Sequence, residues 1–193
     1  MSPAQLRLAL RLLKGRHKWR NRALLILGCR TGMRVSELLA LQAGQIWDGS
    51  KIRSRIYLDR RDTKGKTYGA SIVLHPRAAA ALDKWIRSRG QVSPGDWLFP
   101  SQRSKDRPMR RVTAWRALHD AFVAAGVNGK SGTHCMRKTF AANVHRALGG
   151  DLFRLAKAMR HTSPLTTLAY LSFRQEEIDR ATGLRRGRFV LSL

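Results

Sequence analysis

The chain has 193 residues, and its 38 Lys and Arg against 12 Asp and Glu give a formal net charge of +26. That charge is far outside the range of an ordinary metabolic enzyme and predicts a polyanionic partner. A hydrophobic content of 43% is enough for a folded core and argues against a basic disordered arm. No apolar run approaches the roughly 20 residues that span a bilayer, and no signal-peptide layout opens the chain, so nucleic acid is favoured over a membrane surface.

Two helices are predicted at the start of the chain. The Ser-Pro pair at residues 2–3 supplies an N-cap and a first-turn proline for a leucine-rich helix that runs to about Lys14. The second helix, residues 19–30, is apolar almost all round and ends at the Thr-Gly pair 31–32. This pattern indicates the buried central helix of an α-rich domain.

A short helix predicted over residues 35–41 carries the first candidate site residues. Arg34 stands at its start, after a glycine that breaks the preceding helix and between two apolar segments. Glu37 lies one turn later, where its carboxylate can orient the Arg34 guanidinium. Most arginines in so basic a chain face solvent, but this context predicts that Arg34 is held at a corner of the fold and favours a site role.

The hydrophobic period changes in the middle of the chain. Residues 45–74 predict a small antiparallel sheet with turns near residues 48–50 and 64–66. The second turn carries Lys64 and Lys66, either of which could reach into a cleft and protonate a leaving oxygen. Without other evidence, a solvated turn is the simpler interpretation of each lysine.

The rest of the chain is mainly helical, so the fold class is predicted to be mainly α with a small antiparallel β-sheet (α+β). Helices are expected over 77–89, 111–125, 133–148, 151–159, a short segment after 163–164, and 175–182. Residues 183–193 are basic and then apolar, so this tail is expected to dock on another surface. The sequence has no internal repeat and no linker between comparable cores, which predicts one domain, residues 1–182, followed by the tail.

Four further candidates lie in the last third. His134 and Arg137 are at i and i+3 of a predicted helix, so both can grip one phosphate near its amino-terminal end. Taken alone, they are equally well explained as solvated residues at a helix start. His161 and Tyr170 are separated by a Ser-Pro helix start and by small residues, including Thr167, that would let a strand approach. Each of these two alone is more often a packed residue.

Two arginines, two histidines and a tyrosine suit attack on a phosphodiester. The anion repels nucleophiles, so fixed donors must neutralise its non-bridging oxygens while a hydroxyl attacks. Cys29 and Cys135 lie in apolar helical patterns without metal-ligand spacing and are predicted to be reduced core residues. The scarcity of carboxylates also argues against a two-metal nuclease. No metal and no cofactor are expected.

Four segments in order resemble the boxes of the tyrosine recombinase (phage integrase) catalytic domain. They are 31–38 (Thr-Gly-Met-Arg-Val-Ser-Glu-Leu), 63–66 (Thr-Lys-Gly-Lys), 134–141 (His-Cys-Met-Arg-Lys-Thr-Phe-Ala), and Arg160-His161 followed by Tyr170. The resemblance covers nearly the whole chain, and the ordered set is specific where no single box would be. One departure is Met-Arg-His at residues 159–161, where the family commonly has Leu-Gly-His.

The resemblance implies metal- and ATP-independent, site-specific DNA recombination through a 3′-phosphotyrosyl intermediate. Tyr170 would be the nucleophile, and Arg34 and Arg137 would hold the non-bridging oxygens. His134 and His161 would bond the phosphate and assist proton movement at the nucleophile.

The resemblance also assigns supporting roles around these residues. Lys64, or alternatively Lys66, would protonate the departing 5′-oxygen, and Glu37 would support Arg34. Further candidates for contacts to DNA are Lys66, Lys138 and Arg160, the last of which adds a cation beside the site where the family commonly has glycine.

The implied partner is double-stranded DNA with a specific site. We expect a homotetramer on DNA, a monomer or weak oligomer when free, no membrane association, and a cytoplasmic, nucleoid-associated location in a prokaryotic, phage or mobile-element context. Two alternatives are a type IB topoisomerase-like relaxation activity and a DNA-binding or architectural protein of the same fold. A missing nucleophile or arginine would indicate the latter, and none is missing. A nonspecific basic binder would not explain the ordered boxes.

Overall fold

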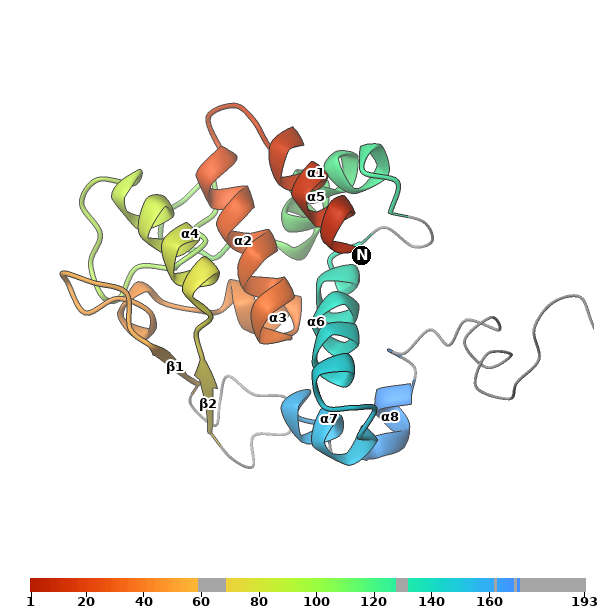
Figure 1. Cartoon of the computed structure of the whole chain (residues 1–193). Coiled ribbons are helices and arrows are strands. Elements are labelled where there is room, and N and C mark those ends of the chain that lie inside the picture. The colour runs from red at the N-terminus through yellow and green to blue at the C-terminus, as the bar shows by residue number, and fades with distance from the viewer. Residues whose placement is uncertain (59–68, 128–131, 162, 169, 171–193) are drawn as a thin grey trace, which may run out of the picture.

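The computed structural model describes residues 1–58, 69–127, 132–161, 163–168 and 170. The described part is mainly helical with a two-stranded antiparallel sheet, which confirms the predicted fold class (Figure 1). The helices are α1 (Pro3–Leu12), α2 (Lys18–Thr31), α3 (Val35–Leu39), α4 (Pro76–Arg87), α5 (Arg111–Ala124), α6 (His134–Ala147), α7 (Leu152–Ala158) and α8 (Pro164–Leu168), with a 3₁₀ turn η1 (Ala43–Gln45) and strands β1 (Arg55–Leu58) and β2 (Ala70–Val73). The predicted helix 175–182, the tail 183–193 and the turn with Lys64 and Lys66 lie outside the described residues.

The predicted start of the first helix and the predicted end of the second are confirmed. Ser2 Oγ accepts a hydrogen bond from the Gln5 amide at 3.2 Å, and Gln5 Oε1 accepts one from the Ser2 amide at 2.8 Å, which forms a capping box. Gly32 ends α2 with a left-handed φ of 62°. An L-residue rarely adopts that conformation, so the glycine lets the chain turn at once toward α3.

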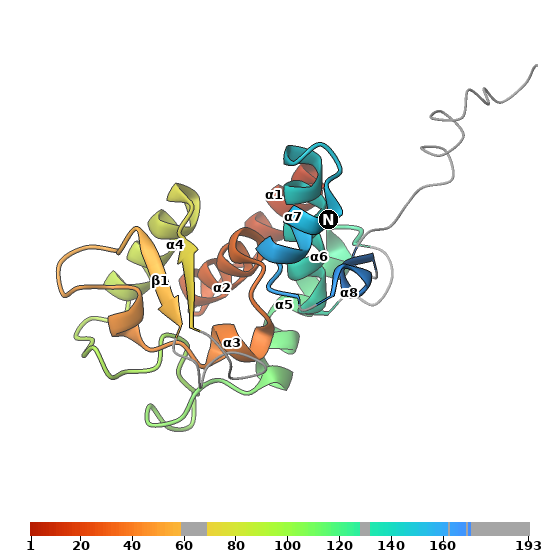
Figure 2. The ribbon, with the colours of Figure 1, turned by 90° about the horizontal axis from the view of Figure 1, so that it is seen from below.

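Helix α2 is the centre of the fold, as its apolar sequence predicts. It packs against α4 on one side and α6 on the other (Figures 1 and 2). Its leucines at 24, 25 and 27 are completely buried. The approach to α6 is close because Gly28 has no side chain: a Cβ there would lie 2.7 Å from Sδ of Met136. This contact sets the distance between the carboxyl end of α2 and the first turns of α6.

A smaller core lies beside α6, where α7 and α8 are placed (Figures 1 and 2). Ala141, Leu155 and Met159 are completely buried there, and Phe140, Val144 and Tyr170 pack against them. Because Tyr170 is one of its members, the position of this tyrosine depends on how α6, α7 and α8 pack together.

Among the described residues of the predicted range 45–74, the paired strands are β1 and β2. Ile56 and Leu58 of β1 face the core, and Ile56 pairs with Ile72 of β2. Ile52, expected in a strand, makes only an isolated bridge to Trp47. The Asp48 carboxylate accepts the amides of residues 50 and 51 and holds the chain in the turn predicted at 48–50.

The prediction that both cysteines are reduced core residues is confirmed, since Cys29 and Cys135 are buried and unbridged. Burial raises the pKa of Cys135 to about 11 and raises that of Cys29 further, so both thiols are protonated at neutral pH. No helix in the described part of the chain is long and apolar enough to cross a membrane.

We predict that Gly32→Ala destabilises the fold by about 2 to 4 kcal/mol, because the new Cβ would overlap the ring of Phe140 in addition to straining the backbone. Urea unfolding measures the change. Gly126→Ala is the matched control: it ends α5 with a φ of 65° but has open space around it, so only about 1 kcal/mol is expected. Equal losses at the two glycines would contradict the proposed overlap.

Candidate active site

Arg137 is the most deeply placed of the predicted site residues. Its side chain extends from α6 into the core, and the residue is 2% exposed. Nη1 donates to the Gly32 carbonyl and Nη2 donates to the Met159 carbonyl at 2.6 Å. These carbonyls belong to the residues that cap the carboxyl ends of α2 and α7, where the backbone carries partial negative charge. The cation is therefore held between the ends of two helices.

One nitrogen of this guanidinium lacks a hydrogen-bond acceptor in the described part of the chain. Arg137 Nε is buried and has no hydrogen-bond partner among the described residues. Leaving a buried donor unpaired costs free energy, so such an atom in a native protein calls for an explanation. A ligand oxygen that arrives from the site would supply the missing acceptor.

Arg34 is held in the manner that its spacing to Glu37 predicts. It is the N-cap of α3, and its backbone amide donates to Glu37 Oε2 at 2.7 Å while its Nη1 lies 3.0 Å from Glu37 Oε1. The same carboxylate is bonded by Arg160, whose Nη2 lies 2.8 Å from Glu37 Oε2. Glu37 is 5% exposed, so a single buried carboxylate bridges two arginines.

The hydrogen bonds of His161 define its protonation state. Its Nε2 lies 2.9 Å from Arg137 Nη2, and its Nδ1 lies 2.9 Å from Oγ1 of Thr167. Arginine can only donate, so Nε2 must be the acceptor and Nδ1 must carry the proton that is donated to the threonine. Burial, followed by Arg137, Arg34 and Arg160, lowers the pKa of His161 to about 4. The imidazole is therefore neutral at pH 7.

Tyr170 completes the cluster. The centroid of its ring lies 5.0 Å from that of His134 and 5.2 Å from that of His161. The Arg137 Cζ lies 5.5 Å from the centre of the same ring. Burial and then the nearby cations Arg137, Lys138 and Arg34 lower the pKa of His134. Both histidines beside the phenol are thus biased toward the neutral form.

The structure brings together most of the residues that the sequence singled out. The gathered residues are Arg34, Glu37, His134, Arg137, Arg160, His161 and Tyr170. Lys138 is exposed on α6. Lys64 and Lys66 lie outside the described residues, so the identity of the lysine that would protonate the leaving oxygen stays a prediction.

The sequence interpretation missed one role in the cluster. Thr167 is predicted to be small enough for a backbone or strand to approach, and the structure adds that it is completely buried and that its hydroxyl orients His161. A histidine needs a partner for its second ring nitrogen, and a threonine six residues away after a Ser-Pro helix start was the available signal.

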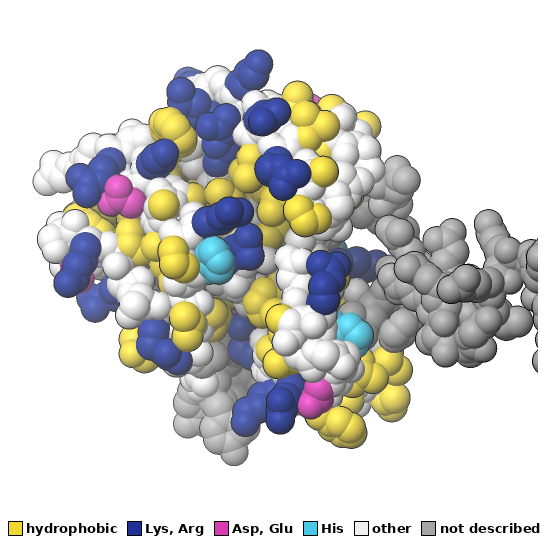
Figure 3. Space-filling view, viewed as in Figure 1, with side chains coloured by type: hydrophobic (Ala, Val, Ile, Leu, Met, Phe, Trp, Pro, Cys, Tyr) yellow, Lys and Arg dark blue, Asp and Glu magenta, His cyan; other side chains and the backbone are white. Residues whose placement is uncertain are grey.

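The surface around these elements is strongly basic. Lys and Arg side chains are scattered over the face shown in Figure 3, where Asp and Glu are few. Outside the cluster, the ion pairs among the described residues involve Asp83, Asp96 and Asp151. Since the chain has 38 Lys and Arg against 12 Asp and Glu, basic side chains far outnumber possible acidic partners. The described residues contain no group of three or more His, Cys, Asp or Glu placed to hold a metal ion.

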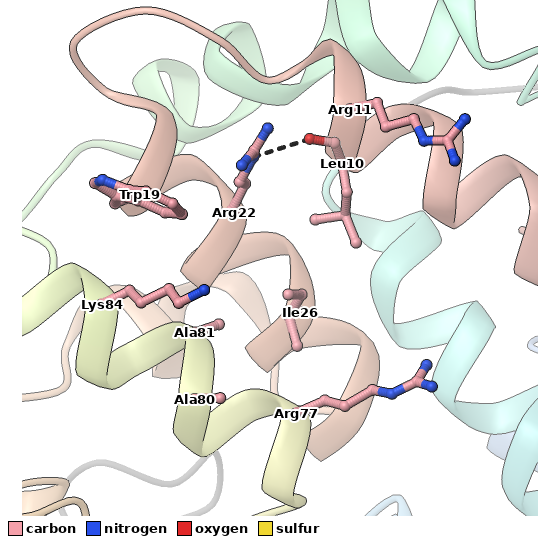
Figure 4. Close-up of a pocket in the computed structure, with 9 residues that line it drawn as sticks. All are labelled: Leu10, Arg11, Trp19, Arg22, Ile26, Arg77, Ala80, Ala81 and Lys84. Atoms are coloured by element: carbon pink, nitrogen blue, oxygen red, sulfur yellow. Dashed lines mark hydrogen bonds between the residues drawn. The ribbon is translucent and has the colours of Figure 1, made fainter.

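A groove of about 390 Å³ between α1, α2 and α4 is separate from the cluster (Figure 4). Its floor is apolar, with Leu10 and Ile26, and its walls carry Arg22 and Lys84. These cations are already engaged: Arg22 Nε donates to the Leu10 carbonyl at 2.9 Å, and Lys84 Nζ lies 5.5 Å from the centre of the Trp19 ring. None of the candidate site residues lines this groove.

The lowered pKa of His161 predicts a loss of stability in mild acid. A histidine in the unfolded chain binds its proton near pH 6.5, but folded His161 does so only near pH 4. Between these values the unfolded state binds more protons, so the free energy of unfolding falls as the pH falls, by roughly 1 to 3 kcal/mol. Urea unfolding at pH 7 and pH 5 should show a smaller loss for His161→Gln than for the unchanged chain.

His145→Gln, on α6 outside the cluster, is the control for replacement of a histidine by glutamine as such. His134 also has a lowered pKa and contributes with the same sign, so the comparison is made between variants and not on the absolute slope. An identical pH dependence for His161→Gln and the unchanged chain would show that His161 titrates normally.

Known proteins resemble the chain over most of its length. It is 26% identical to the probable integrase/recombinase YoeC of Bacillus subtilis (strain 168) over 162 residues, which cover 84% of this chain and 82% of that protein. It is 31% identical to the tyrosine recombinase XerD of Mycobacterium leprae (strain TN) over 158 residues, which cover 78% of this chain and 47% of XerD. The chain thus matches about half the length of that XerD.

Solved structures show the same fold. One is the XerH site-specific recombinase bound to palindromic difH substrate in a post-cleavage complex. The match covers 95% of this chain and 52% of the XerH chain, with a TM-score of 0.76 and 22% identity. The XerA recombinase matches 98% of this chain and 66% of its own, with a TM-score of 0.72 and 22% identity. The sequence profile of the phage integrase family matches residues 1–177, and by this match the chain belongs to the phage integrase family.

Proposed function

We propose that residues 1–182 are the catalytic domain of a site-specific DNA recombinase, which cuts and rejoins DNA through a phosphotyrosine. The observation that carries this proposal is the placement of Tyr170 against His134, His161 and Arg137, residues that come from three separate segments of the chain. A phenol, two neutral imidazoles and a buried guanidinium form a set suited to nucleophilic attack on an anion. The relatives XerD and XerH are named as recombinases, which supports the same activity.

The two arginines would neutralise the phosphodiester. Arg137 is fixed by two carbonyls and retains a buried, unpaired Nε that can donate to a non-bridging oxygen. Arg34 is fixed by Glu37 at one edge, and its side chain is 27% exposed, which leaves donors available to a ligand at the surface. Both guanidinium groups are thus held at the site before the phosphate arrives, and they would stabilise negative charge on it.

Tyr170 would then attack the phosphorus atom. Its hydroxyl oxygen forms a bond to phosphorus, the bond from phosphorus to the 5′-oxygen breaks, and the DNA is left with a 3′-phosphotyrosyl link and a 5′-hydroxyl. The phenolic proton passes to a neutral histidine, for which the unprotonated Nε2 of His161 is suited once Arg137 bonds the phosphate. The proton for the 5′-oxygen comes from Lys64 or Lys66 in this proposal.

Rejoining follows from the same chemistry. The phosphotyrosine keeps the energy of the broken phosphodiester, so a 5′-hydroxyl can attack it in the reverse direction without ATP. Attack by the hydroxyl of a second duplex gives recombination, whereas attack by the original strand gives topoisomerase-like relaxation. We propose that four protomers carry out recombination on double-stranded DNA with a specific site. The proposed location is the cytoplasm, in association with the nucleoid, and the proposed source of the gene is a prokaryote, a phage or a mobile element.

We predict that Tyr170→Phe abolishes covalent attachment to DNA while DNA binding stays within a few-fold of the unchanged protein. The substrate is a duplex selected from a randomised pool by binding, with nicks placed at successive positions so that the cut end diffuses away. Denaturing gels then detect a protein-DNA band, in buffer with EDTA. Tyr57→Phe is the matched control because Tyr57 is 60% exposed on β1, and it should form the band normally.

Two further measurements test the proposal: which end of the DNA strand is attached to the protein, and whether the attached strand is transferred to another duplex or resealed. Attachment through a 3′ phosphate and transfer to an added duplex with a free 5′-hydroxyl support a recombinase. Resealing of the original strand alone would replace recombination by relaxation. A band that persists in Tyr170→Phe would show that another residue is the nucleophile.

A further inference from the structure

We infer that Arg160 is a positioning residue, which fixes Glu37 and through it the phosphate-binding Arg34. This inference rests on the proposed function for its catalytic consequence, but the contact itself belongs to the free protein. It assigns Arg160 a role different from the direct DNA contact that the sequence predicts.

The hydrogen bonds divide the Glu37 carboxylate between two partners. Oε1 lies 3.0 Å from Arg34 Nη1, and Oε2 accepts both the Arg34 amide at 2.7 Å and Arg160 Nη2 at 2.8 Å. The side chains of Arg160 and Glu37 are 20% and 4% exposed. A pair so far from solvent is held in one geometry more firmly than a surface ion pair.

Arg160 also helps to keep the carboxylate ionised. Burial acts to raise the pKa of Glu37, and Arg160 is the strongest of the influences that oppose it, ahead of the bonds from Arg34. The result is a pKa below the ordinary value. Without the Arg160 cation, the negative charge of the buried Glu37 carboxylate would be less well balanced, and its hydrogen bonds to Arg34 would weaken.

The backbone at Arg160 is unusual for an arginine. Its φ is 55°, and among the described residues it is the one non-glycine residue with a positive φ. The Arg160 amide donates to the Lys157 carbonyl at 3.0 Å and the His161 amide to the Ala156 carbonyl at 2.9 Å, which is the Schellman arrangement that ends α7. Glycine would adopt this position without strain, so the presence of arginine indicates a use for its side chain.

The turn also explains why one residue can serve Glu37 while the next serves Arg137. After α7 ends, Arg160 is directed to the carboxylate on α3 and His161 is directed to the guanidinium on α6. Both phosphate-binding arginines are therefore tied to consecutive residues of one turn. A change at Arg160 should disturb Arg34 and leave the carbonyl bonds of Arg137 in place.

The test compares Arg160→Gly, Glu37→Gln and the double variant. Glycine suits the backbone at residue 160, so its substitution removes the guanidinium without new strain. Single-turnover cleavage of the selected nicked duplex is measured at saturating protein, and DNA affinity is measured at several salt concentrations. Arg154→Ala, which breaks the exposed ion pair with Asp151, is the control for loss of one positive charge.

If Arg160 acts through Glu37, each single change slows cleavage by about 10- to 100-fold, and the double variant is no slower than the slower single variant. Arg160→Lys should recover part of the rate because an ammonium can still bond the carboxylate. The salt dependence of DNA affinity should match that of Arg154→Ala or of the unchanged protein. A direct phosphate contact would instead lower the salt slope by about one and give losses that multiply in the double variant, and that result would overturn the inference.

The same variants separate this inference from the proposed function. Thermal unfolding of the four free proteins forms a double-mutant cycle that needs no DNA. Non-additive shifts in Tm support the pair even if no covalent complex forms, in which case the proposed function fails alone. Additive shifts would show that Arg160 and Glu37 do not interact and would overturn the inference whatever the activity.

Discussion

The burial of the Arg137 guanidinium is the constraint on which the site and much of the packing depend. A buried cation in a chain of net charge +26 is costly unless it is well bonded. Its compensation comes from the carbonyl ends of α2 and α7, so both helices must end within reach of the first turn of α6. The close contact at Gly28 and the sharp turn at Gly32 satisfy this requirement.

The scarcity of carboxylates makes Glu37 the second constraint. Three arginines lie in this region, and the carboxylate that the described structure places among them is Glu37. Sharing it between Arg34 and Arg160 leaves the cluster with an excess of positive charge. That excess is unfavourable in the free protein and favourable once an anion is present, which is the arrangement expected of a site that stabilises charge on a phosphate.

Local sequence patterns predicted what depends on neighbours along the chain. The helices, their caps and the Arg34–Glu37 pair at i and i+3 follow from periodicity, turn residues and spacing. Contacts made by the backbone could not be predicted this way: the carbonyls that hold Arg137 belong to Gly32 and Met159, whose side chains carry no signal. The Arg160–Glu37 bond joins residues 123 positions apart, and the burial of Thr167 depends on how α8 packs against α7. Such features need the tertiary arrangement.

The low pKa of His161 connects these constraints to DNA binding. Burial and three arginines keep the imidazole neutral in the free protein, and the same arginines repel one another. A phosphodiester bound among these arginines would attract all of them. Its negative charge would oppose both the lowering of the His161 pKa by the arginines and the repulsion between the guanidinium groups. Binding would then stabilise the folded chain and raise the proton affinity of His161 as the phenol of Tyr170 approaches the phosphorus atom. A group that gains basicity only when the substrate is present can accept the phenolic proton at the step where it is released.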